Sequence, residues 1–122
     1  MAETNSILVV DDERTMREFL ETSLRPRFHV RTAADGTEAL DILAEEAFDL
    51  ILSDVQMPVV GGLELLAELQ EREGNWPPII LMTAFGTVEQ AVQATRHGAL
   101  DYLCKPFGLD QLDLVLDRAF AM

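Results

Sequence analysis

The sequence predicts an α/β fold, a doubly wound, five-stranded parallel sheet of strand order 2-1-3-4-5 flanked by five helices. Two observations lead to this prediction. Short apolar runs alternate with longer segments whose apolar residues recur at helical spacing, and the alternation repeats five times. The runs at residues 7–10 and 50–52 are continuously apolar, which is typical of strands buried on both faces. Such repeated units join through right-handed crossovers.

The first unit begins with a strand over residues 7–10, which is β-branched at three of its four positions. This strand runs into the acidic cluster Asp11-Asp12-Glu13. Helical spacing of apolar residues then starts at Arg14, and Pro26 ends the helix.

The second unit begins with a more polar strand. Apolar and polar residues alternate over residues 28–33, which suits a strand at the edge of the sheet. Asp35 and Gly36 are expected to form only a turn. The apolar face of the next helix is expected on Ala39, Leu40, Leu43, Ala44 and Ala47.

The third strand brings Asp54 to its end, where Met57-Pro58 and Gly61-Gly62 stop it. A helix marked by leucines 63, 66 and 69 follows and fades at residues 74–78. The fourth strand is expected over residues 79–82, ending in Thr83-Ala84.

The next helix is expected to open at Gly86-Thr87, with Thr87 as N-cap and Gln90 at the capping-box position. One side of it carries Val88, Ala91, Val92 and Thr95, and His97-Gly98 closes it. A strand over 102–104 stops at Lys105-Pro106. The last helix buries Leu112, Val115, Leu116, Ala119 and Phe120.

Length and charge restrict the class of protein. A chain of 122 residues fits one domain that needs no disulfide or structural metal. The formal net charge of −13 argues against direct binding to nucleic acid or an anionic membrane, and suits cations and basic partners. The single Cys104, the absence of a signal peptide and the absence of a membrane-spanning apolar run predict a soluble, cytoplasmic protein.

Five polar residues follow the predicted strands: Asp11, Asp12, Asp54, Thr83 and Lys105. In open parallel sheets, ligands bind beyond the carboxyl ends of the strands, near the point where strand order reverses. We therefore expect these five residues to meet at one edge of the sheet. Each of them alone is more often a cap, a solvated helix start or an exposed turn. Their coincidence at successive strand ends favours a site.

The predicted site suits phosphoryl transfer. Neighbouring carboxylates repel one another by several kcal/mol per pair at an effective dielectric of about 20, so they must gain protons or bind a cation. All-oxygen ligands suit Mg²⁺, with Mn²⁺ as the alternative, rather than Zn²⁺. Lys105 adds a positive charge and Thr83 a hydroxyl that can donate to an anion. Asp54 is then the expected nucleophile.

Four segments resemble the receiver domain of two-component response regulators: Val-Val-Asp-Asp-Glu (9–13), Asp-Val-Gln-Met-Pro with a trailing Gly-Gly-Leu (54–63), Met-Thr-Ala (82–84) and Asp-Tyr-Leu-Cys-Lys-Pro-Phe (101–107). The resemblance covers essentially the whole chain. It implies a flavodoxin-like fold and one receiver domain over residues 1–122, with a core of about 6–120.

The resemblance also implies roles for the site residues. Asp54 would accept a phosphoryl group from a phosphohistidine of a sensor histidine kinase. Asp11, Asp12, Asp54 and the backbone carbonyl of Gln56 would hold Mg²⁺. Lys105 would pair with the phosphoryl oxygens, and its peptide bond to Pro106 would be cis.

A switch is implied as well. Thr83 would move to hydrogen-bond the phosphoaspartate, and Tyr102 would rotate inward. The outer face of helix 4, strand 5 and helix 5 would then change for an output domain or another receiver. Gln56 and Phe85 occupy positions that flank the path of the hydrolytic water. The protein is expected to be no enzyme beyond catalysing its own phosphorylation and dephosphorylation.

A narrower resemblance lies in residues 83–92, with Gly98-Ala99-Leu100-Asp101-Tyr102. These segments are similar in sequence to receivers of nitrogen-regulator (NtrC-like) type, which precede an ATPase domain and a DNA-binding domain. It implies that the chain is the amino-terminal part of a longer transcription regulator, in which DNA contact is made elsewhere.

Other readings stay open from the sequence. A Mg²⁺-dependent aspartyl phosphatase of the haloacid-dehalogenase kind also uses a strand-end Asp, but it usually has a second Asp where this chain has Gln56. A flavodoxin-like electron carrier would need a Ser/Thr/Gly-rich loop in place of Asp11-Asp12-Glu13. A stand-alone phosphorelay receiver, or an inactive docking receiver, is the alternative within the family.

Overall fold

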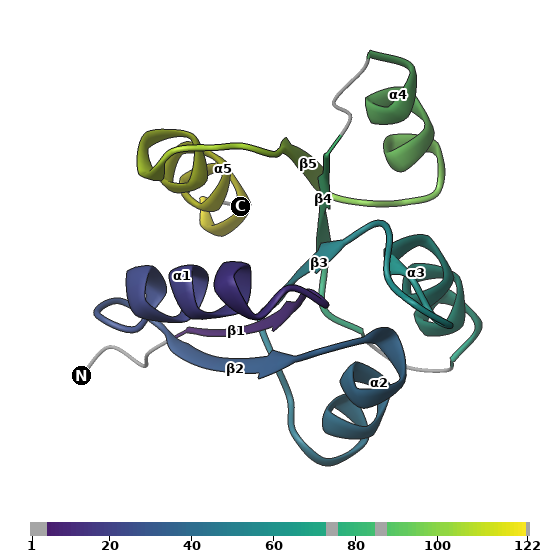
Figure 1. The fold of residues 1–122 in the computed structure, drawn as a ribbon. Helices are drawn as coiled ribbons and strands as arrows, with labels where there is room; N and C mark the ends of the chain where they lie inside the picture. Colours follow the sequence, from purple (N-terminus) through teal and green to yellow (C-terminus); the bar gives the residue numbers. More distant parts are fainter. Residues whose placement is uncertain (1–4, 73–75, 85–87, 122) are drawn as a thin grey trace.

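The computed structural model describes residues 5–72, 76–84 and 88–121. Within these residues, five strands form one parallel sheet in the order β2-β1-β3-β4-β5, so the predicted order is confirmed. Strands and helices alternate along the chain (Figure 1). In order they are β1 (Ser6–Val10), α1 (Arg14–Leu24), β2 (His29–Ala33), α2 (Gly36–Glu45), β3 (Leu50–Asp54), α3 (Gly62–Glu71), β4 (Ile79–Thr83), α4 (Val88–Arg96), β5 (Asp101–Cys104) and α5 (Leu109–Phe120).

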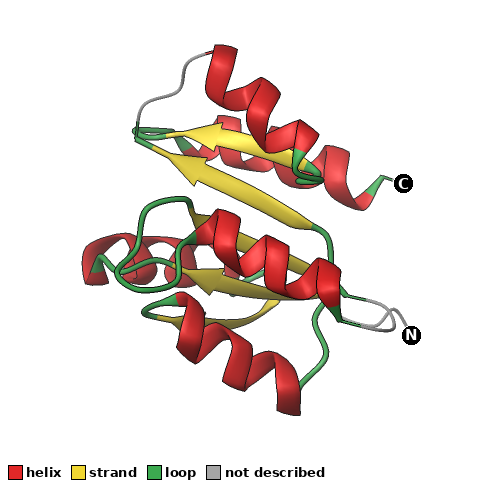
Figure 2. Cartoon of the chain, turned by 90° about the vertical axis from the view of Figure 1, so that its right-hand side faces the viewer, coloured by secondary structure: helices red, strands yellow, loops and turns green. Residues whose placement is uncertain are grey.

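Helices cover both faces of the sheet and bury a separate apolar cluster on each. Successive strand residues point to opposite faces, so Ile7 and Val9 pack with α1 and α5, whereas Leu8 and Val10 pack with α2 and α3. Figure 2 shows the helices in front of the sheet and behind it. β1, β3 and β4 lie inside the sheet, which explains why their apolar runs show no polar alternation.

The start of α2 is more than the expected turn. The side chain of Asp35 caps the helix by accepting a hydrogen bond of 2.8 Å from the Glu38 backbone N–H. A Cβ atom placed on Gly36 would lie 2.4 Å from Cγ1 of Val60. Only glycine therefore allows α2 to pack this closely on the segment that follows β3.

The predicted apolar face of α2 is wrong at two positions. Ala39 is buried and Leu40 and Leu43 are half-buried, but Ala44 and Ala47 are exposed. Ile42, outside the predicted set, is buried instead. Burying the large Ile42 side chain contributes more stabilising free energy than burying an alanine methyl group. The isoleucine therefore decides how the helix is rotated about its axis.

The expected N-cap of α4 at Gly86-Thr87 lies outside the described residues. On the helix itself, Val92 is 44% exposed and Thr95 is exposed. Gly98 ends the segment with a positive φ of 99°, a backbone conformation that glycine adopts without penalty. Among the described residues, no helix is both long and apolar enough to cross a bilayer.

Candidate functional site

Residues from four strand ends meet at the carboxyl edge of the sheet. Asp11 follows β1, Asp54 ends β3, Thr83 ends β4 and Lys105 follows β5. Because β3 pairs with both β1 and β4, and β4 pairs with β5, the sheet order alone brings these ends together. Lys105 Nζ lies 2.8 Å from Asp11 Oδ2 and 3.0 Å from Asp54 Oδ2. The predicted meeting of these residues at one edge is observed.

A small pocket of about 270 Å³ opens over this edge. Three of the predicted acids cluster at this edge: Asp11, Asp12 and Asp54 each offer a carboxylate oxygen, and these oxygens lie within 4.8 Å of one another. The pocket is lined by Asp12, Glu13, Asp54, Val55, Gln56, Thr83, Ala84 and Lys105. Its donor set consists of oxygens, so it fits a hard divalent cation such as Mg²⁺ or Mn²⁺.

Asp11 is fully buried, and hydrogen bonds hold its backbone N–H and both of its carboxylate oxygens. Its N–H donates to the Ala33 carbonyl at 3.1 Å, Oδ1 accepts from the Glu13 N–H at 2.9 Å, and Oδ2 accepts from Lys105. Asp12, the next residue, is exposed on the pocket rim. The two adjacent acids thus differ, because Asp11 is buried and fixed by its hydrogen bonds whereas Asp12 is exposed at the pocket.

Asp54 is only 8% exposed. Its Oδ2 accepts from Lys105 Nζ, and its Oδ1 accepts from the Gln56 N–H at 3.3 Å. Burial raises the pKa of Asp54 above its usual value, although the Lys105 ammonium opposes this shift. Keeping the Asp54 carboxylate ionised in this buried position therefore costs free energy, which a further cation would reduce.

Lys105 is the only lysine in the sequence. Burial by itself lowers the pKa of Lys105, but its hydrogen bonds to Asp11 and Asp54 outweigh burial and raise that pKa. The side chain stays charged at neutral pH and holds the two buried carboxylates together. Its peptide bond to Pro106 is cis, as the resemblance to receiver domains implied.

Thr83 is 8% exposed and lines the pocket, as predicted for a residue that could contact an incoming anion. Tyr102 is half-buried on β5, where it pairs in register with Leu81 of β4. Its inward rotation remains a prediction. Phe85 lies outside the described residues.

Three residues near the site were not singled out from the sequence. Glu13 places Oε1 3.8 Å from Lys105 Nζ. Arg17 donates from Nη1 to the Asp11 carbonyl at 2.8 Å. A Cβ on Gly62 would lie 2.5 Å from the Asp54 carbonyl oxygen. The acidic run and the double glycine were visible signals for Glu13 and Gly62, but nothing in its helical pattern distinguishes Arg17.

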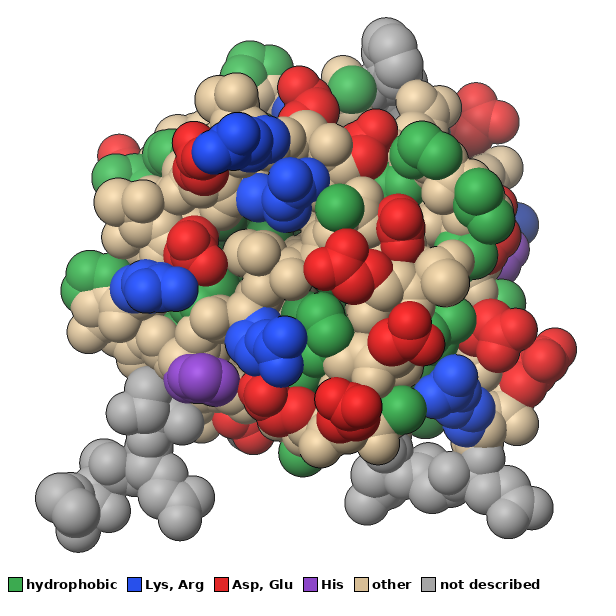
Figure 3. Space-filling model, turned by 60° about the horizontal axis from the view of Figure 1, so that its bottom comes forward, with side chains coloured by type: hydrophobic (Ala, Val, Ile, Leu, Met, Phe, Trp, Pro, Cys, Tyr) green, Lys and Arg blue, Asp and Glu red, His purple; other side chains and the backbone are tan. Residues whose placement is uncertain are grey.

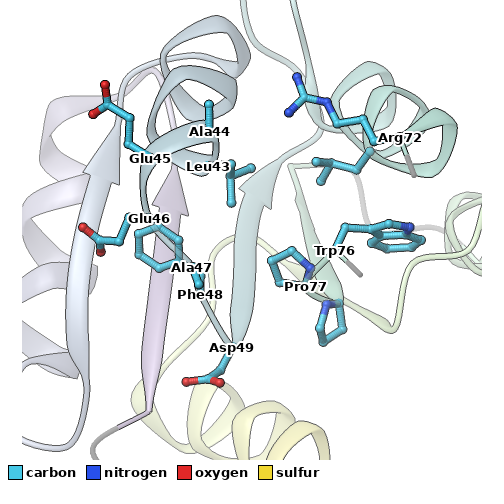
Figure 4. Close-up of a pocket in the computed structure, with 12 residues that line it drawn as sticks. Leu43, Ala44, Glu45, Glu46, Ala47, Phe48, Asp49, Arg72, Trp76 and Pro77 are labelled. Carbon is cyan, nitrogen blue, oxygen red and sulfur yellow. The ribbon is translucent and has the colours of Figure 1, made fainter. Parts of the chain in front are cut away.

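A larger hollow of about 670 Å³ lies at the opposite end of the sheet, between the ends of α2 and α3 (Figure 4). Phe48, Trp76 and Pro77 form its apolar part, with Glu45 and Arg72 at its margin. In the described part of the chain, the acidic cluster able to hold a metal is that of Asp11, Asp12 and Asp54, at the other end. The size of a pocket therefore does not by itself identify the candidate functional site.

Acidic side chains are spread over the face shown in Figure 3, with basic ones among them. Elsewhere in the described residues, surface acids form ion pairs such as Arg27–Asp113 at 2.8 Å and Arg31–Glu46 at 3.3 Å. This distribution agrees with the formal net charge of −13. Such exposed pairs contribute little to stability.

Comparison with known proteins agrees with the geometry. The family described as the response regulator receiver domain matches residues 7–117. The regulatory protein AtoC of Escherichia coli is 42% identical over 123 residues, which cover 100% of this chain and 26% of that protein. The response regulator protein FleR of Pseudomonas aeruginosa is 46% identical over 115 residues, or 93% of this chain and 24% of FleR. The chain thus spans about a quarter of the length of these curated relatives.

Solved structures show the same fold. The chemotaxis response regulator CheY4 of Vibrio cholerae superposes with a TM-score of 0.89 at 32% identity, covering 97% of this chain and 100% of CheY4. NtrX of Brucella abortus gives a TM-score of 0.87 at 34% identity, covering 98% of this chain and 27% of the NtrX chain.

Proposed function

This chain belongs to the response regulator receiver domain family, and from that membership we propose that it is a signalling switch whose phosphoacceptor is Asp54. The observation that best supports the proposal is the bridge from Lys105 Nζ to Asp11 and Asp54, at 2.8 and 3.0 Å. It joins the ends of three strands distant in sequence, beside a pocket whose lining includes the carboxylates of Asp12, Glu13 and Asp54. A surface ion pair would not need such burial.

Asp11, Asp12, Asp54 and the backbone carbonyl of Gln56 would hold Mg²⁺, and Mn²⁺ could replace it. The ion would supply positive charge that offsets the negative charges of the carboxylate and the phosphoryl group. The oxygen cluster within 4.8 Å supports this assignment. Asp11 would contribute its carboxylate from the buried side of the site, and Asp12 would contribute its carboxylate from the exposed rim.

In the proposed transfer, a carboxylate oxygen of Asp54 attacks phosphorus while the bond from phosphorus to the donor's imidazole nitrogen breaks. The electron pair leaves with the imidazole ring. Lys105 Nζ already donates to Asp54, so a small displacement would bring it onto the phosphoryl oxygens. The Thr83 hydroxyl would donate to another of these oxygens. The domain would catalyse only its own phosphorylation and dephosphorylation.

The phosphodonor would be a sensor histidine kinase in the cytoplasm. Thr83 and Tyr102 would couple Asp54 to the face formed by α4, β5 and α5, where an output domain or a second receiver would bind. The relatives include proteins named for regulation, among them the transcriptional regulatory protein ZraR of Escherichia coli, 40% identical over 116 residues. These names support an output in transcription through a domain other than this one.

Intact-mass measurement after treatment with a small phosphodonor and Mg²⁺ tests the proposal. The parent should gain one phosphoryl group and Asp54→Asn none. Asp12→Ala, which removes an exposed rim carboxylate, should also gain none. Asp41→Asn, a control at an exposed acid on α2, should react like the parent. Full phosphorylation of Asp54→Asn would overturn the assignment of the acceptor.

A second assay separates the switch from an aspartyl phosphatase. The domain is incubated with excess small phosphomonoester and Mg²⁺, and released phosphate is followed over many equivalents of protein. A receiver should show no sustained release of phosphate from the phosphomonoester. Sustained turnover that is lost in Asp54→Asn would establish the phosphatase instead.

A further inference from the structure

Arg17 reaches back from helix α1 to the edge of the sheet. It is the fourth residue of α1, and side chains on a helix tilt toward its N-terminus. The half-buried Arg17 side chain follows this direction, and its Nη1 donates to the Asp11 carbonyl at 2.8 Å. The bond connects α1 to the loop that carries both acids of β1.

Ordinary electrostatics do not explain this placement. A cation near a helix N-terminus is unfavourable because that end carries partial positive charge. The chain has 22 acidic and 9 basic residues, yet Arg17 forms no ion pair with any described residue. Arg14, on the same turn, pairs in solvent with Glu18 at 3.0 Å. Arg17 instead donates a hydrogen bond from Nη1 to one backbone carbonyl, that of Asp11.

The hydrogen bond from Arg17 to the Asp11 carbonyl completes the set of bonds to the polar groups of Asp11. The N–H, Oδ1 and Oδ2 of Asp11 are held by Ala33, Glu13 and Lys105. With the carbonyl also held, the peptide unit between residues 11 and 12 has one fixed orientation. Asp12 is exposed, and its carboxylate has no hydrogen bond to a described residue. The direction of the Asp12 side chain therefore depends on the backbone that Arg17 fixes.

We infer that Arg17 is a positioning residue for divalent-cation binding, because it orients the loop from which Asp12 joins Asp11 and Asp54. The inference rests on the proposed function, since it concerns the same metal site. Without the guanidinium, the buried Asp11 carbonyl loses its partner and the loop can rotate. Asp12 then spends less time in the cluster, and the affinity for Mg²⁺ falls.

Calorimetric titration of the unphosphorylated domain with MgCl₂ tests this role without any phosphodonor. Arg17→Met should bind Mg²⁺ about tenfold more weakly than the parent, the lower end of the range for groups that orient metal ligands. Arg17→Lys keeps the charge and one donor but loses the fixed guanidinium geometry, so it should bind Mg²⁺ more weakly than the parent and more tightly than Arg17→Met. Arg14→Met, the matched control, removes a cation from the same turn and should bind like the parent.

The sign of the change separates positioning from charge. If Arg17 acted only as a nearby positive charge, its removal would strengthen binding of a cation. Equal or tighter Mg²⁺ binding by Arg17→Met would therefore overturn the inference. If that variant does not fold, Arg17→Lys replaces it, and parental affinity in the folded lysine variant would overturn the inference in the same way.

A merely structural role is recognised by thermal unfolding in EDTA. Positioning predicts that Arg17→Lys unfolds within a few degrees of the parent while its Mg²⁺ affinity falls. An affinity loss found only together with a matching loss of metal-free stability contradicts the inference. A parent that binds no Mg²⁺ at all would instead defeat the proposed function, so the two failures are distinguishable.

Discussion

The Asp54 carboxylate is held where its charge is poorly solvated. The side chain is 8% exposed, and burial raises its pKa even though Lys105 Nζ lies 3.0 Å away. Residues at functional sites often lower the stability of the fold because reactivity needs buried, poorly solvated charge. Asp54 is therefore expected to weaken the metal-free protein, and its replacement tests this at the level of one residue.

Asp54→Asn should stabilise the metal-free domain at neutral pH. A raised pKa means that the folded parent binds a proton more tightly than the unfolded chain, so the parent loses stability as pH rises from the ordinary value of 3.8 through the raised one. Asn does not titrate, so its advantage is absent below this range and complete above it. Urea unfolding in EDTA should show a gain of about 1 kcal/mol at neutral pH.

The comparison is made at an acidic pH and at neutral pH, with Asp41→Asn as the exposed control. The control should match the parent at both values. A constant difference between Asp54→Asn and the parent at all pH values would contradict the assigned origin of the effect.

Val59 is the second residue that weakens the fold. It is 93% exposed and has a φ of 66°, a conformation that is unfavourable for a β-branched side chain. Val59→Gly should remove about 1–2 kcal/mol of backbone strain. The greater freedom of glycine in the unfolded chain offsets about 0.5–1 kcal/mol of this gain.

We therefore expect Val59→Gly to unfold at a higher urea concentration than the parent, with an unchanged slope. Val59→Ala keeps the Cβ atom and most of the strain, so it should stay close to the parent. Equal stability of the glycine and alanine variants would show that the backbone at residue 59 stores no strain.

At the scale of elements, the connection from β3 to α3 is unusually tight. A Cβ on Gly61 would lie 2.4 Å from the Val55 carbonyl oxygen, and one on Gly62 would lie 2.5 Å from the Asp54 carbonyl oxygen. Helix α3 can therefore begin directly against the end of the strand that carries Asp54. Gly36 of α2 packs on Val60 of the same connection, so two helices abut the wall of the site.

Gly62→Ala should force β3 and α3 apart. Overpacking of this kind costs about 1–3 kcal/mol, and here the displaced group is backbone rather than a flexible side chain. Because the displaced carbonyl belongs to Asp54, Mg²⁺ affinity should fall together with stability. Chemical unfolding and calorimetric titration measure the two effects.

Gly108→Ala is the matched control, because a Cβ at Gly108 meets no atom within 4 Å. Gly108 is the N-cap of α5, so the control should lose less than about 1 kcal/mol and keep its Mg²⁺ affinity. Similar losses in both variants would show that the close approach at Gly62 has no special effect on the site.

At the scale of the whole molecule, the site links the ends of strands across the sheet. Lys105 connects the end of β5 to residues at the ends of β1 and β3, while helices cover both faces. A ligand bound to Asp11, Asp12 and Asp54 would join two of these strand ends, those of β1 and β3. Binding at this edge should therefore stabilise the entire fold.

Mg²⁺ should raise the unfolding free energy of the parent by about 2.7 kcal/mol at a concentration one hundred times the dissociation constant. Asp12→Ala should abolish this gain and leave metal-free stability near that of the parent, because Asp12 is exposed and unbonded to other described residues. Thermal unfolding with and without EDTA measures both quantities. An undiminished gain in Asp12→Ala would place the ion elsewhere.

The meeting of Asp11, Asp54, Thr83 and Lys105 could be predicted because local patterns mark the strands and their ends, and the strand order followed from the fold class that five such units indicate. Apolar runs mark the strands, and parallel strands end at the same edge. The orientation of α2 could not be predicted in the same way. Its alanines suit either side of a helix, and only packing against the sheet buries Ile42 while exposing Ala44.

By itself, the sequence determined the number and order of the elements and the residue types at the strand ends, because periodicity and strand termination are local properties of the chain. The tertiary structure alone decided that Asp11 is buried while Asp12 is exposed, and that Arg17 donates to the carbonyl between them. Those assignments depend on distances between atoms of different elements, which are set only when β1, α1 and β5 pack together.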